Sequence, residues 1–229
     1  MSRHPAPDEL LLDYAAGVLP EGPALAVALH VAIDPASRRV VERLRDVGVA
    51  LIEGAAQIDG EAVANDLGDV ALEQALARLD SVPVEALRAP VAARPGFARP
   101  GFEWAPAPLR PYLAGKEWKR VFGGFDEIRL GLHDGDTHRV SLLRLEPGKG
   151  LPVHRHIADE FTIVLQGGYT DNTGNYGVGD FAVGPGPQEH EPIADPGEPC
   201  IALIVVEKPI VLTGVWARLL NPLVRWGWM

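Results

Sequence analysis

From about residue 118 to residue 206, the chain alternates short apolar segments with turn-forming residues. Pairs such as Gly123-Gly124, Asp134-Gly135 and Pro147-Gly148 mark positions where the backbone can reverse between neighbouring strands. Many short strands at this spacing are typical of a β-sandwich or a β-barrel. The expected strands are Trp118–Phe122, Ile128–Leu132, Val140–Leu145, Phe161–Leu165, Asp180–Val183 and Ile201–Val206.

The N-terminal part of the chain has a helical pattern instead. Asp34-Pro35 indicates an N-cap followed by a proline at the first helical position, and the helix that it opens has an apolar stripe. This stripe is formed by Val40, Leu44, Val47 and Leu51, and Gly54–Asp59 breaks it. The other three expected helices are Pro7–Ala16, Glu21–Ile33 and Leu67–Leu79. Together the four helices predict a small helical bundle.

Six prolines between residues 82 and 108 separate the two parts. Proline fixes φ and favours extended backbone, so this segment indicates a semi-rigid linker. The expected organisation is a helical domain at 1–81, a Pro/Arg-rich linker at 82–108 and a β-domain at 109–229, which makes the fold class α+β. The last apolar stretch, Val215–Val224, is expected to be a short helix.

The charge of the chain is concentrated at its N-terminal end. Residues 1–85 contain 15 acidic and 6 basic residues, a net charge of −9, whereas residues 86–229 contain 16 and 15, a net charge of −1. This balance argues against nucleic-acid binding and favours a basic protein partner, although plain solubility explains it as well. No apolar run reaches 18 residues and the N-terminus lacks the apolar core of a signal peptide, so a cytoplasmic protein without membrane contact is expected.

The most informative motif lies between Gly148 and His190. His154, His156 and Glu160 share parity, so on an extended segment their side chains can point to one face, and His190 can approach from another strand. Three imidazoles and a carboxylate suit one divalent ion, with zinc first and iron, manganese or nickel as alternatives. The single Cys200 excludes an internal disulfide and a cysteine-based zinc finger.

These positions resemble the two motifs of the cupin superfamily, which implies a jelly-roll β-barrel for residues 109–229. The likeness extends further, because the segments Asp8–Gly17, Ala75–Asp80, Leu109–Leu113 and Leu212–Gly214 resemble the ChrR family. Members of that family are bacterial anti-sigma factors with an N-terminal zinc-binding helical domain and a C-terminal cupin domain. The resemblance therefore implies an extracytoplasmic-function sigma factor as partner.

The resemblance also implies an N-terminal zinc site, formed by one early histidine and the pattern His-x3-Cys-x2-Cys. His4 and His30 occupy the histidine positions, but Asp34 and Ser37 stand where the cysteines belong. Aspartate can bind zinc, whereas serine is a poor ligand. Because an N-cap role explains Asp34 without metal, we expect no tightly bound zinc ion at His4, His30 and Asp34.

Two functions from different classes follow. The first is a transcriptional regulator in which the helical domain binds a sigma factor and the metal-bound cupin domain senses a stress signal. The alternative is a metal-dependent cupin dioxygenase or related small-molecule enzyme, of the kind that cleaves β-diketones. The sequence favours the regulator and leaves open the metal, the signal and the oligomeric state, including a homodimer.

Overall fold

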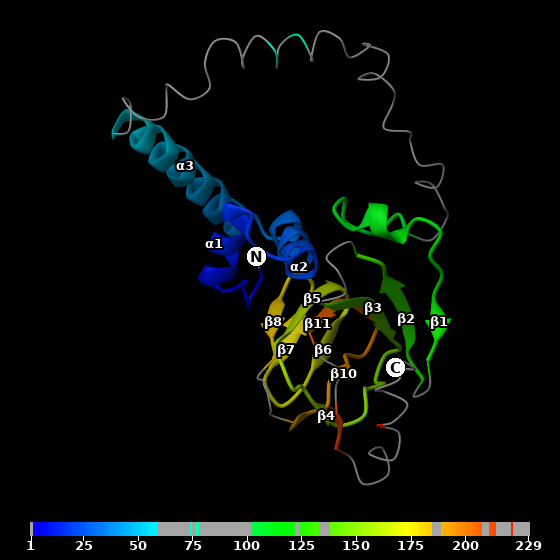
Figure 1. The fold of residues 1–229 in the computed structure, drawn as a ribbon. Coiled ribbons are helices and arrows are strands. Elements are labelled where there is room, and N and C mark those ends of the chain that lie inside the picture. The colour runs from blue at the N-terminus through cyan, green and yellow to red at the C-terminus, as the bar shows by residue number, and fades with distance from the viewer. Residues whose placement is uncertain are drawn as a thin grey trace.

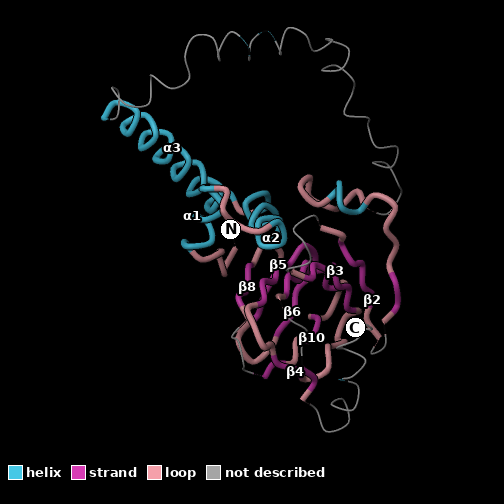
Figure 2. Tube along the Cα trace, viewed as in Figure 1, coloured by secondary structure: helices cyan, strands magenta, loops and turns pink. Residues whose placement is uncertain are grey.

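A computed structural model describes residues 2–58, 74, 77, 102–121, 124–132, 138–184, 189–207, 211–213 and 221. The described part consists of N-terminal helices and a set of short strands, and Figure 2 shows the two kinds of element gathered on different sides of the molecule. The expected fourth helix at 67–79, except for two isolated positions, and the expected helix at 215–224, except for residue 221, lie outside the described residues. The helical elements are α1 (Asp8–Ala16), α2 (Glu21–Ile33), α3 (Pro35–Ile58) and the 3₁₀ helix η1 (Arg110–Leu113).

The helix boundaries follow the local signals of the sequence. Gly17 ends α1 in the left-handed conformation, with φ of 72°, which glycine adopts without steric cost. Asp34 caps α3, because its Oδ2 accepts the N–H of Ser37 at 2.9 Å. The predicted N-cap is therefore confirmed.

The expected break in α3 at Gly54 is wrong, because the helix continues to Ile58. An apolar stripe indicates which face of a helix is packed, so the end of the stripe need not be the end of the helix. The backbone hydrogen bonds of the helix can continue beyond it. One glycine in a helix costs about 1 kcal/mol relative to alanine, which is too little to end it. The first half of the stripe, Val40 and Leu44, packs on the core, while Val47 and Leu51 are exposed.

The strands confirm the predicted β-fold. All six expected strands are present with boundary shifts of one or two residues: the first is shortened to Lys119–Arg120, and the second is displaced by two residues to Asp126–Leu130. The other strands are mostly two or three residues long. In chain order the strands are β1 (Lys119–Arg120), β2 (Asp126–Leu130), β3 (Arg139–Leu145), β4 (His154–Arg155), β5 (Glu160–Gln166), β6 (Gly168–Thr170), β7 (Asn175–Gly177), β8 (Phe181–Val183), β9 (Glu189–His190), β10 (Ile193–Ala194), β11 (Cys200–Val206) and β12 (Val211–Leu212).

The described strands form one large and two small antiparallel sheets. The large sheet has the order β1-β2-β3-β11-β5-β8, and the small sheets have the orders β10-β6-β7 and β12-β4-β9. Figure 1 shows them arranged as a barrel with the helices at one end. This is the cupin-like architecture that the sequence predicts.

The central strands of the large sheet are buried on both faces. Leu203 pairs with Leu142 and Ile163, and these side chains face the helices. The preceding residue, Ala202, pairs with Leu143 and faces the barrel interior. Because side chains alternate along a strand, β3, β5 and β11 read as nearly continuous apolar runs and form the centre of the molecule.

Helix α2 covers the outer face of this sheet. It contacts β5 and β11, and Leu25, Ala26 and Leu29 of α2 belong to the same core as Leu142 and Leu203. The N-terminal helices and the barrel therefore share one hydrophobic core. No single described helix is long and apolar enough to span a membrane; α1 and α2 pass such a test only as a pair, which is bent by 109°.

Because α2 packs closely on the sheet, we can predict the effect of adding a side chain at Gly22. A Cβ atom there would lie 3.0 Å from Cγ2 of Val140 and 3.2 Å from Cγ1 of Val205. We expect Gly22→Leu to lower the free energy of unfolding, measured by chemical denaturation, by about 1–3 kcal/mol through overpacking. The matched control is Gly48→Leu in α3, where no atom lies within 4 Å of the added Cβ. Equal effects of the two variants would contradict the close contact between α2 and the sheet.

Candidate metal centre

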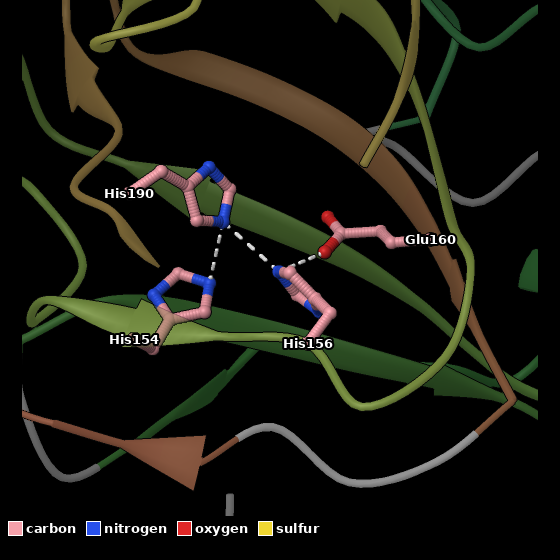
Figure 3. Close-up of side chains that lie close together, drawn as sticks. All are labelled: His154, His156, Glu160 and His190. Carbon is pink, nitrogen blue, oxygen red and sulfur yellow. Dashed lines mark hydrogen bonds and ion pairs between the residues drawn. The ribbon is translucent and has the colours of Figure 1, made fainter. Parts of the chain in front are cut away.

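The histidines and the glutamate of the predicted motif converge inside the barrel (Figure 3). His154 in β4 pairs directly with His190 in β9. His156 follows β4, and Glu160 is the first residue of β5. All four side chains are buried, and one ligand atom from each lies within 4.8 Å of the others. The strand pairing thus brings together all four residues that the sequence selected.

The tautomers of His154 and His190 leave their Nε2 atoms, which are candidate metal ligands, without protons in the neutral ring. Nδ1 of His154 lies 2.9 Å from the carbonyl oxygen of Pro152, which can only accept a hydrogen bond. Nδ1 of His190 lies 3.0 Å from a carboxylate oxygen of Asp171. Each Nδ1 therefore donates, and in the neutral ring Nε2 keeps its lone pair.

These lone pairs point at one another. Nε2 of His190 lies 2.9 Å from Nε2 of His154 and 2.9 Å from Nε2 of His156. The unprotonated Nε2 atoms of His154 and His190 repel each other at this distance, and a cation bound between them would remove the repulsion. The arrangement can hold a divalent metal ion, because neutral imidazole is a preferred ligand of transition metals.

Glu160 completes the donor set with a negative charge. Its Oε2 contacts Nε2 of His156, and both this oxygen and Nδ1 of His156 are buried without a hydrogen-bond partner. Burial raises the pKa of Glu160, but the close contact of its carboxylate with the ring of His156 outweighs this effect and leaves the pKa lowered. Burial, assisted by the charge of His190, lowers the pKa of His154 to about 4. At neutral pH the carboxylate of Glu160 is thus ionised and the imidazole of His154 is neutral.

Asp171 orients the site from outside the donor set. Its Oδ1 accepts the N–H groups of Thr173 and Gly174, so the turn after β6 fixes the carboxylate, while its Oδ2 faces His190. A carboxylate that accepts the second N–H of a ligating histidine fixes the ring and raises its basicity. Asp171 was not among the site residues selected from the sequence. The contact between Asp171 and His190 joins residues 19 positions apart, and no pattern in a single sequence indicates it.

A cavity of about 120 Å³ adjoins the four candidate ligands. Its walls are mostly apolar, and Leu143, Leu145, Ala202 and Ile204 are among the lining residues. Glu127 also faces the cavity, but it accepts hydrogen bonds from Arg139 and Ser141, both at 2.7 Å, which balance its charge. A metal ion in this site would therefore adjoin space for a small, largely apolar molecule.

Cys200 lines the same cavity but is not one of the grouped candidate ligands. Burial raises the pKa of its thiol to about 12, so the sulfur stays protonated at neutral pH. Cys200 therefore behaves as a small buried apolar residue.

The structure does not bring the N-terminal candidates His4, His30 and Asp34 together as a metal-binding group. Among the described residues, such a group is formed only in the barrel, by His154, His156, Glu160 and His190, which we call the barrel cluster. The ring of His4 packs on Tyr176 of β7 with 4.7 Å between the ring centroids. His30 and Asp34 lie at the junction of α2 and α3.

Comparisons with known proteins identify similar proteins over nearly the whole chain. Residues 113–209 match the family model described as the ChrR Cupin-like domain. The anti-sigma-E factor ChrR of Cereibacter sphaeroides is 31% identical over 227 residues, which cover 97% of this chain and 98% of that protein. The crystal structure of Rhodobacter sphaeroides SigE in complex with the anti-sigma ChrR matches with a TM-score of 0.69 and 30% identity, covering 89% of this chain and 98% of that chain.

The geometry predicts that the barrel cluster loses its metal when one imidazole is removed. We expect His156→Ala to lower the bound metal from one ion per chain to nearly none, because an incomplete donor set binds far more weakly. Metal content of the purified full chain is the measurement. His138→Ala, at a position outside the cluster, is the control and should keep its metal. Undiminished metal in His156→Ala would contradict the assignment.

Asp171 is expected to tune the affinity of the same site. We expect Asp171→Asn to weaken metal binding by about 10- to 100-fold in a competition titration with a chelator. Glu189→Gln removes the same charge beside His190 without touching the Nδ1 contact, and should change the affinity much less. If both variants behave alike, the effect of Asp171 is one of net charge rather than of its hydrogen bond.

Proposed function

The chain belongs to the ChrR family of anti-sigma factors, and from this premise we propose that its helices bind an extracytoplasmic-function sigma factor while its barrel holds one divalent metal ion. The functional units in this proposal are the helical part at 1–81, the linker at 82–108 and the cupin part at 109–229. A sigma partner implies a cytoplasmic location. The similar complex of ChrR with SigE supports a sigma factor as partner.

The observation that carries the sigma-binding proposal is the exposed half of α3. Figure 1 shows α3 projecting away from the barrel. Along this half, Val47, Leu51 and Ile52 are 55%, 68% and 72% exposed. Apolar side chains gathered on a projecting helix mark an interaction surface, because leaving them in water is unfavourable.

Charge supplies the long-range part of this interaction. Residues 2–58 contain 8 acidic and 5 basic residues, whereas residues 59–85 contain 7 and 1, so most of the net charge of −9 lies just beyond α3. Such a segment attracts a basic surface and accelerates association, and salt screens this attraction. The proposed contact is therefore apolar at α3 and electrostatic beyond it.

The barrel is proposed to act as the sensing unit. Three imidazoles and one carboxylate fit zinc, our first choice, and also iron, manganese and nickel. When bound, the ion would supply a Lewis acid to an oxygen-bearing molecule in the cavity. His154, His156, Glu160 and His190 would hold it, and the apolar walls would select the molecule that enters.

The cavity also favours a second candidate function. A metal ion beside an apolar cavity is the arrangement that a small-molecule dioxygenase uses, so an enzyme remains the alternative. Oxygen uptake by the iron-loaded chain with acetylacetone as probe distinguishes it. Turnover together with failure to bind any sigma factor would replace the regulatory proposal.

The sigma-binding proposal predicts the effect of a charge on α3. The full chain, co-expressed with the extracytoplasmic-function sigma factors of the source organism, should capture one of them, with an association rate that falls as salt rises. We expect Leu51→Asp to weaken this binding by at least about tenfold, since it removes apolar contact and adds a desolvation cost. Ile193→Asp changes an exposed apolar residue of the barrel and should bind normally. Equal loss in both variants would contradict a docking surface on α3.

A further inference from the structure

A buried polar cluster lies where the N-terminal segment, α2, α3 and the β7–β8 turn meet. It consists of His4, His30, Asp34, Ser37 and Asp180, and we call it the polar hub. His30, Asp34, Ser37 and Asp180 are each at most 3% exposed. The first four occupy the positions where the family resemblance implies a zinc site, so the chemistry of the hub decides whether zinc fits there.

The hydrogen bonds of His30 use both ring nitrogens. Nδ1 donates to the carbonyl oxygen of Gly179 at 2.9 Å, and Nε2 accepts the N–H of Ala6 at 3.1 Å. Ser37 Oγ lies 2.8 Å from the same Nε2 and donates to it. A carbonyl can only accept and a backbone N–H can only donate, so these partners fix one neutral tautomer. No lone pair of His30 is left for a metal ion.

The other three positions are also committed to the protein. The two carboxylate oxygens of Asp34 accept the N–H groups of Ser2 at 3.2 Å and of Ser37 at 2.9 Å. The ring of His4 packs on Tyr176 with 4.7 Å between the ring centroids, and it does not group with His30 and Asp34 as a candidate metal ligand. Serine is in any case a poor zinc ligand. The residues present do not fit a zinc ion.

The hub also joins the helices to the barrel. Oδ1 of Asp180 accepts the N–H groups of Arg3 at 2.6 Å and of His4 at 3.0 Å. The turn before Asp180 approaches the end of α2 so closely that a Cβ atom at Gly179, whose φ is +86°, would lie 2.9 Å from Cγ2 of Ile33. Hydrogen bonds from one buried cluster thus reach four segments that are distant in sequence.

We propose that the hydrogen bonds of the polar hub replace the zinc ion implied by the family and anchor the N-terminal helices to the barrel. Zinc in such a domain holds segments together through four ligand bonds, and loss of the metal releases them. In this chain the same segments are held by donors and acceptors that no chelator removes. Burial lowers the pKa of His30 and favours the neutral ring that these hydrogen bonds require. The helical part is therefore independent of metal.

The test compares the wild-type full chain with His30→Phe, which keeps a buried ring but removes both ring nitrogens. Zinc content by native mass spectrometry and amide hydrogen exchange are measured with and without EDTA. We expect equal zinc content in the two chains and no effect of EDTA on exchange in residues 24–41. We also expect exchange in residues 24–41 to rise by about tenfold or more in His30→Phe, because buried donors and acceptors lose their partners.

A milder variant keeps the test decisive if His30→Phe does not fold. Ser37→Ala removes one donor to His30 and should raise the same exchange by about fivefold at unchanged zinc content. Ser2→Ala is its matched control, because Ser2 bonds to Asp34 through its backbone N–H and should exchange like wild type. Loss of one zinc ion per chain in either hub variant, or faster exchange of wild type in EDTA, would overturn the proposal. So would wild-type exchange in Ser37→Ala. The EDTA comparison is repeated on His156→Ala, whose barrel site is expected to be nearly empty, so that loss of a barrel ion is distinguished from loss of an ion in the hub.

Discussion

The structure depends on one sheet that must be covered on both faces. Strands β3, β5 and β11 have apolar side chains on alternating sides, so neither face can be left in water. Residues of the small sheets, among them Tyr169 and Leu212, line the barrel interior on one side of this sheet, while α2 covers the other side. The same strands therefore support the four candidate metal ligands on one side and contact the N-terminal helices on the other.

Two polar clusters use this frame in different ways. In the barrel, the lone pairs of His154 and His190 face each other, and a cation bound between them would relieve their repulsion. In the polar hub, every described donor and acceptor of His30 has a protein partner, an arrangement that excludes one. Strand β8 connects the two clusters. Just before this strand, the carbonyl oxygen of Gly179 accepts a hydrogen bond from His30. Just after it, the N–H of Gly184 donates to the carbonyl oxygen of Glu160 at 2.7 Å. Histidine chemistry alone does not identify a metal site; the partners of both ring nitrogens do.

The long elements were predictable because they repeat a pattern. Strands such as β5 and β11 contain enough apolar residues to identify, and Asp34-Pro35 marked the start of α3. The two-residue strands β4 and β9 have no period, and only pairing across the barrel defines them. Spacing selected the four candidate ligands, yet Asp171 escaped notice because its contact with His190 joins residues 19 positions apart. The polar hub was reduced to the N-cap at Asp34 for the same reason, since Gly179 and Asp180 belong to the barrel.

The central claim is that the chain holds a metal ion in the barrel and none in the helical part. X-ray absorption spectroscopy of the metal-loaded full chain tests both halves at once. We predict one ion per chain whose first shell contains three imidazole nitrogens and at least one oxygen at about 2.0–2.2 Å, with no sulfur. A sulfur neighbour at about 2.3 Å would place Cys200 among the ligands, and a second ion per chain would restore a metal to the helices. Either result would contradict the account.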